Sequence, residues 1–87
     1  MNNKITFDEV LLKVQVIFRD VLEDDDMKLT YEVNSSDIPE WDSLNHISLV
    51  VTIEKEFQIQ FIASEIQNFL NVGEMCDAIV LKVNQQS

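Results

Sequence analysis

Apolar residues recur every three to four positions along the first quarter of the chain, which is the spacing of one face of an α-helix. These positions are Val10, Leu11, Val14, Ile17, Phe18, Val21 and Leu22. Upstream, Thr6 and Glu9 have the spacing of a helix-capping box, and Ile5 and Val10 that of a hydrophobic staple. The pattern predicts a helix over about 6–23.

A second helical pattern begins at Asp42, a residue type favoured at a helix N-cap. The apolar residues at 44, 47, 50, 51 and 57 fit the helical period better than the alternation of a strand, although several of them are β-branched. We therefore expect a helix over about 42–57.

Two further helices are expected in the last third of the chain, a short one over about 63–69 and a longer one over about 72–84. Asn71 with Glu74 predicts a cap for the last helix, Leu70 with Met75 a staple, and Gly73 eases its start. We expect its inward residues to be Met75, Ile79, Val80 and Val83, and the end from Asn84 to fray.

The chain has 87 residues but only one glycine and one proline. It therefore lacks the frequent turn residues of a protein built from strands and tight turns. Its length suits one small domain. We expect an all-α fold over 1–87, a four-helix bundle of three longer helices and one short helix, with a long loop at about 25–41.

Composition narrows the class of protein. A hydrophobic fraction of 46% is too high for a disordered acidic tail. No apolar run approaches the roughly 20 residues of a membrane span. A single cysteine allows no internal disulfide, and no signal peptide follows Met1, so we expect a cytoplasmic protein.

Sixteen acidic residues against six basic ones give a net charge of −10, and residues 20–42 alone carry −8. This charge argues against binding to nucleic acids or anionic membranes and favours basic protein surfaces. Taken alone, an acidic run of this kind is typical of a solvated loop.

The chain offers little for catalysis or metal binding. His46 is the only histidine, and Cys76 lies among apolar residues as a buried thiol would, so neither a catalytic site nor a zinc site is expected. A calcium loop starting at Asp24 fails because Leu29 replaces its glycine and Ser35 its last ligand. We expect no enzymatic activity.

Ser43 is the most informative candidate site. It follows a loop and opens the second helix, where unpaired N–H groups and the helix dipole favour a negative charge. A phosphate on its hydroxyl would be stabilised there.

From Asp42 the chain reads Asp-Ser-Leu-Asn-His-Ile-Ser-Leu-Val-Val, and Glu-Lys-Glu-Phe at 54–57 ends the same helix. Together with the order of helices and the acidic loop, this resembles the acyl carrier protein family over nearly the whole chain. The resemblance implies that a phosphopantetheinyl transferase moves 4'-phosphopantetheine from coenzyme A to Ser43. The thiol of that arm would carry acyl, aminoacyl or polyketide groups as thioesters between biosynthetic enzymes.

Some positions depart from the fatty-acid-synthesis members of that family. Asn45 and Ser48 stand where acids are usual, and Lys55 also replaces a common acid. The loop before Ser43, Ile38-Pro39-Glu40-Trp41-Asp42, looks more like that of discrete carriers from specialised pathways. The cargo cannot be read from the sequence.

We expect a monomer that docks transiently on its partner enzymes. The candidate docking residues are Trp41, Leu44, Asn45, Ile47, Ser48, Val51, Glu54 and Glu56. Trp41 could instead pin the loop to the bundle, Val51 could be part of the core, and His46 is expected on the surface. An unmodified acidic adaptor for a basic protein is the alternative function.

Overall fold

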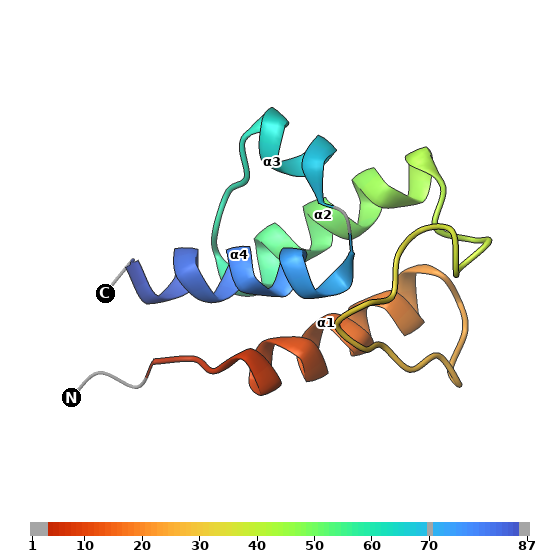
Figure 1. Cartoon of the computed structure of the whole chain (residues 1–87), viewed down its shortest axis with the longest axis horizontal. Helices are drawn as coiled ribbons and strands as arrows, with labels where there is room; N and C mark the ends of the chain where they lie inside the picture. The colour runs from red at the N-terminus through yellow and green to blue at the C-terminus, as the bar shows by residue number, and fades with distance from the viewer. Residues whose placement is uncertain (1–3, 70, 86–87) are drawn as a thin grey trace.

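A computed structural model of the chain describes residues 4–69 and 71–85. It contains the helices α1 (Phe7–Val21), α2 (Ser43–Phe57), α3 (Ala63–Asn68) and α4 (Val72–Gln85). Helix α1 packs against both α2 and α4. The short α3 lies within the segment that joins α2 to α4 (Figure 1). The expected all-α bundle of three longer helices and one short helix is confirmed.

Helix α1 begins where its capping box predicts. The Glu9 N–H donates to Thr6 Oγ1 at 3.3 Å, and the Thr6 N–H donates to Glu9 Oε1 at 3.0 Å. Each of these bonds satisfies a backbone donor that the first helical turn leaves without a partner. The helix ends at Val21, two residues earlier than predicted, and Glu23 then takes a left-handed φ of 55°.

One continuous core joins α1, α2 and α4. Its completely buried side chains are Val10, Val14, Phe18, Leu49, Ile53, Val72, Met75, Cys76 and Ile79. Close packing of such side chains, rather than helix propensity, supplies most of the stability of short helices.

The inward face of α2 differs from the predicted stripe. Its buried residues are Leu49, Val50, Ile53 and Phe57, whereas Leu44, Ile47 and Val51 are exposed. Apolar residues occupy two faces of this helix, so the helical period identifies the helix but not the face that packs. Val51 is therefore not a core residue.

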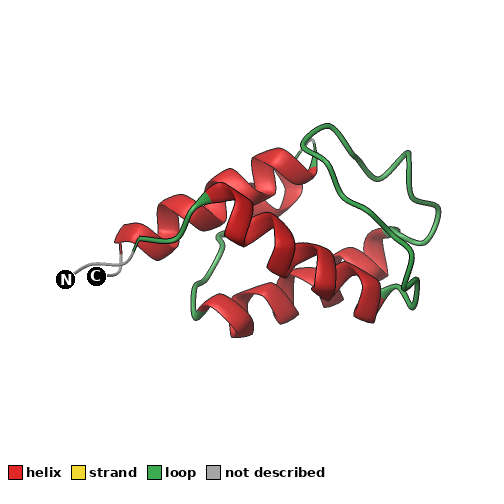
Figure 2. Cartoon of the chain, turned by 90° about the horizontal axis from the view of Figure 1, so that it is seen from below, coloured by secondary structure: helices red, strands yellow, loops and turns green. Residues whose placement is uncertain are grey.

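The loop from 22 to 42 is more than a solvated acidic segment. Met27, Leu29, Ile38 and Trp41 from this loop are buried in the core, while most of its acids are exposed. The Leu29 N–H donates to the Gln15 side chain of α1 at 2.8 Å. These buried side chains and this bond fix the loop across one end of the bundle (Figure 2).

The loop also meets the start of α4. The N–H groups of Val72 and Gly73 donate to the carbonyl oxygens of Val33 and Tyr31, both at 2.8 Å. A Cβ atom at Gly73 would overlap the Tyr31 ring. Gly73 is therefore needed for this close approach, and not only to ease the start of the helix.

Both ends of α4 were only partly predicted. Asn71 Oδ1 accepts from the Glu74 N–H at 2.8 Å, which confirms the cap, whereas the Leu70 staple lies outside the described residues. Asn84 does not fray: its side chain accepts from the Ile5 N–H at 3.0 Å and donates to the Ile5 carbonyl at 3.3 Å. This contact ties the end of α4 to the segment before α1.

None of the helices within residues 4–69 and 71–85 is long and apolar enough to cross a membrane.

Candidate functional site

Ser43 is the first residue of α2 and is exposed to solvent. Asp42 caps the helix, as predicted: its Oδ1 accepts from the Asn45 N–H at 2.8 Å. The Asn45 side chain in turn donates to the Glu40 carbonyl at 2.8 Å. Ser43 therefore stands at a rigid turn, with its hydroxyl open to an approaching enzyme.

Trp41 holds that turn against the bundle. Its side chain is only 6% exposed, and its ring meets Phe18 of α1 edge-on, with centroids 5.0 Å apart. This packing supports the alternative that Trp41 pins the loop to the bundle, whereas a contact of Trp41 with partners stays a prediction.

His46 is not the simple surface residue that we expected. It is half-buried, its Nδ1 accepts from the Trp41 indole N–H at 3.0 Å, and its Nε2 lies 3.0 Å from the Ile66 carbonyl oxygen. The ring therefore connects the loop, α2 and α3.

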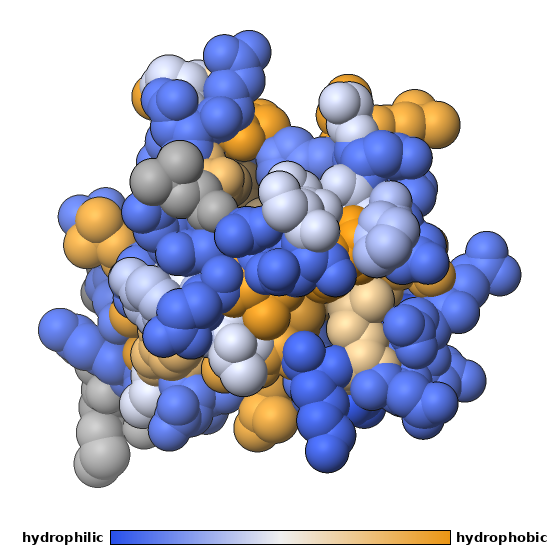
Figure 3. Space-filling view, turned by 45° about the vertical axis from the view of Figure 1, so that its right-hand side comes forward, coloured by the Kyte–Doolittle hydropathy of each residue, from blue (hydrophilic) through white to orange (hydrophobic). Residues whose placement is uncertain are grey.

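An exposed apolar strip runs along α2 from the serine. Leu44, Ile47 and Val51 are 75%, 60% and 43% exposed, and we call these three residues the α2 strip. The face drawn in Figure 3 is largely hydrophilic with several apolar areas. Exposed apolar residues grouped on one helix face are typical of a contact surface.

The polar docking candidates differ in their solvent exposure and in the hydrogen bonds that they make within the protein. Ser48 is exposed, and Asn45 is half-buried and bound within the turn. Glu54 accepts from the Phe61 N–H at 2.8 Å and so stabilises the segment after α2. Glu56 is exposed, with Lys13 of α1 at 3.7 Å. Glu54 is therefore engaged in a bond that holds the fold, whereas Glu56 lies on the surface beside Lys13.

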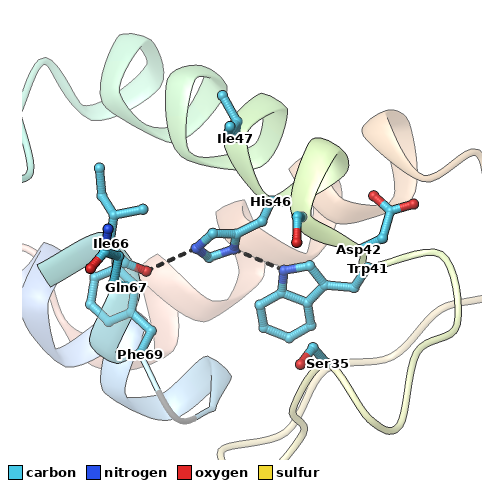
Figure 4. A pocket seen from close by; sticks show the side chains of 9 residues that line it. Ser35, Trp41, Asp42, His46, Ile47, Ile66, Gln67 and Phe69 are labelled. Carbon is cyan, nitrogen blue, oxygen red and sulfur yellow. Dashed lines mark hydrogen bonds between the residues drawn. The ribbon is translucent and has the colours of Figure 1, made fainter. Parts of the chain in front are cut away.

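A pocket of about 670 Å³ opens beside Ser43. The residues lining it are Ser35, Trp41, Asp42, Ser43, His46, Ile47, Ile66, Gln67 and Phe69 (Figure 4). The contributions of Ser35 and of the α3 residues could not be predicted, because no local pattern shows that α3 folds back toward the start of α2.

The remaining candidates for chemistry are the single cysteine and the potential metal ligands. Burial, helped by the charge of Asp77, raises the pKa of the Cys76 thiol to about 12, so this thiol stays protonated near neutral pH. No group of three potential metal ligands is found in the described part of the chain. The accessible hydroxyl at the start of α2 is the feature that remains.

No protein-family model and no curated protein sequence matches the chain. A solved structure does match: the solution NMR structure of a holo acyl carrier protein from Geobacter metallireducens, with a TM-score of 0.84 and 38% sequence identity. The match covers 88% of this chain and 88% of that one. The similarity thus includes the sequence as well as the fold.

Proposed function

Since the chain belongs to the acyl carrier protein family, we propose that Ser43 carries the 4'-phosphopantetheine arm of that family. A member of this family is a carrier and not an enzyme. The arm, when attached, supplies a thiol that holds acyl groups as thioesters. The observation that carries the proposal is the exposed position of Ser43 directly behind the Asp42 cap.

The residues around Ser43 suit a phosphodiester. The first turn of α2 contains no acidic side chain, and the N–H groups that open a 15-residue helix favour a negative charge. Trp41 and Asn45 hold the turn, so little conformational entropy is lost when a transferase binds it.

The α2 strip supports the proposal that the transferase and the acyl-loading and acyl-transferring enzymes dock beside Ser43. Exposed apolar residues next to an acidic loop combine a small contact area with electrostatic steering. Such an interface favours fast, short-lived binding, which a shuttle between enzymes needs.

Family membership also supports the proposal that the protein works in the cytoplasm.

We further propose a carrier of a specialised pathway rather than of housekeeping fatty acid synthesis. Asn45 and Ser48 leave the first two turns of α2 without the acids that are usual in fatty acid carriers. Intact mass spectrometry of the protein from its native host tests this, because it reports the attached acyl group together with the arm. A long, saturated fatty acyl group as the main cargo would contradict the proposal.

The attachment site is tested by incubating the chain with coenzyme A and a broad-specificity phosphopantetheinyl transferase. We expect a mass increase of one phosphopantetheine and one new reactive thiol, because native Cys76 stays buried and protonated. Ser43→Ala should abolish both changes. Ser64→Ala, which alters an exposed serine of α3 outside the candidate docking residues, is the control and should react like the parent.

Equal uptake of the arm by Ser43→Ala would overturn the assignment of the site. No uptake by the parent chain, with a second carrier protein modified in the same tube, would favour the unmodified acidic adaptor.

A further inference from the structure

His46 joins three parts of the pocket wall through the two nitrogens of its ring. It lies one helical turn after Ser43, with the Trp41 indole on one side and the Ile66 carbonyl of α3 on the other, each at 3.0 Å (Figure 4). We call this hydrogen-bonded chain, Trp41–His46–Ile66, the latch.

The partners of the latch determine which protonation state it needs. An indole N–H can only donate, so Nδ1 of His46 must accept; a carbonyl oxygen can only accept, so Nε2 must donate. Only the neutral ring with its proton on Nε2 satisfies both bonds. A second proton on Nδ1 would face the indole N–H, and the bond to Trp41 would be lost.

Helix α3, the far wall of the pocket, has few other restraints. It has six residues and none of them is buried, although Ile66 and Phe69 pack partly against the core. Glu65 pairs with Lys82 at 3.0 Å and accepts from the Ile62 N–H at 2.9 Å, and Phe69, just after the helix, meets Phe61 edge-on. An element with so little buried area opens at low free-energy cost.

We propose that His46 is a proton-controlled latch, which holds α3 in place as the far wall of the pocket beside Ser43 when neutral and releases α3 when protonated. Histidine is the side chain that changes charge between about pH 5 and pH 8. We expect the pocket to keep its present width while the ring is neutral and to widen when the ring gains a second proton.

Asp42 is the charged residue among those that line the pocket. In α3, Glu65 is held by Lys82 of α4 and by the Ile62 N–H, and in α1 the Arg19 side chain donates to the Met27 carbonyl. Only the link between the latch and the arm on Ser43 rests on the proposed function.

The latch is tested first on the unmodified chain by NMR, so its failure is separate from any failure of Ser43 to accept the arm. The ring nitrogens should report the Nε2–H form at neutral pH. Exchange of the Trp41 indole proton and of the Ile66 amide, which donates to the Ile62 carbonyl at 3.1 Å, is then followed from about pH 7.5 to about pH 5.5. After correction for intrinsic exchange, protection should fall about 3- to 10-fold, the equivalent of one hydrogen bond.

His46→Gln is the matched variant, because its amide can accept from Trp41 and donate to Ile66 without titrating. It should remove the pH dependence at Trp41 and Ile66. The Val10 amide of α1, bonded to the Thr6 carbonyl, should keep its protection in both proteins. The same loss of protection in His46→Gln, or an Nδ1–H ring at neutral pH, would overturn the latch.

A second experiment links the latch to the carrier. An environment-sensitive fluorophore on a pantetheine analogue is attached to Ser43, and its emission is followed over the same pH range. We expect a shift towards the emission of an apolar environment at low pH in the parent chain and none in His46→Gln. A shift of equal size in both would show that the pocket opens without His46.

Discussion

At the scale of single residues, Gly73 shows how one position can decide the packing of a distant segment. Its N–H donates to the Tyr31 carbonyl at 2.8 Å, and the Tyr31 ring occupies the space of a side chain at position 73. The Tyr31 hydroxyl also donates to Asp77 of α4 at 3.0 Å, which raises the pKa of the tyrosine. The loop that leads to Ser43 is thereby fixed to α4.

Gly73→Ala should lower the free energy of unfolding by roughly 1–3 kcal/mol, because the new methyl group must displace the near atoms of the Tyr31 ring. Urea unfolding followed by circular dichroism measures this change. In the background of Tyr31→Ala the space is free, and the same substitution should be neutral or slightly stabilising because alanine favours a helix. Equal costs in the two backgrounds would contradict the steric explanation.

At the scale of elements, α2 serves the core and the site with two different faces. Leu49, Ile53 and Phe57 are buried, whereas the α2 strip faces solvent on the same helix. The helix therefore fixes Ser43 to the rigid core and leaves the α2 strip exposed, as the proposed docking surface requires.

Two isoleucines of α2, Ile53 on the buried face and Ile47 on the exposed face, allow the contribution of each face to stability to be measured separately. Ile53→Ala should lower the free energy of unfolding by roughly 2–5 kcal/mol, since Ile53 is completely buried. Ile47→Ala should change it by less than about 0.5 kcal/mol. Urea unfolding measures both values.

Ile47→Ala should instead slow the modification of Ser43 by the transferase, roughly fivefold, which corresponds to about 1 kcal/mol of lost contact. Initial rates by intact mass spectrometry check this at equal protein concentration. An unchanged rate would remove Ile47 from the proposed docking surface.

At the scale of the whole molecule, charge is distributed unevenly. The net charge is −10, and residues 20–42 carry −8 of it. The buried anchors Met27, Leu29, Ile38 and Trp41 hold this acidic segment against the end of the bundle at which α2 starts (Figure 1). A fixed acidic surface beside the proposed attachment site is suited to steering basic partners.

Raising the salt concentration from about 0.1 M to about 1 M shortens the Debye length from roughly 10 Å to roughly 3 Å. We expect modification of Ser43 to slow by about tenfold, measured as the second-order rate constant with the transferase. Asp25→Asn with Asp26→Asn should lower the rate at low salt and flatten this dependence. The control is Asp8→Asn, in the first turn of α1 at the other end of the bundle, which should leave the rate unchanged. Rates that do not depend on salt would contradict electrostatic docking.

The sequence alone determined the elements of this protein. Capping pairs and apolar spacing are local signals, so Thr6 with Glu9, Asp42, and Asn71 located the starts of three helices to within a residue. The motif around Ser43 is also local, and it indicated the family that the structural match then showed.

Only the tertiary structure decided which faces pack and which side chains meet. Nothing local distinguishes Ile47 from Ile53, or shows that His46 bonds to Ile66 twenty residues away and that Trp41 packs on Phe18. These contacts depend on how the loop and α3 fold back on the bundle. That folding minimises the free energy of the whole core, to which residues distant in sequence contribute together.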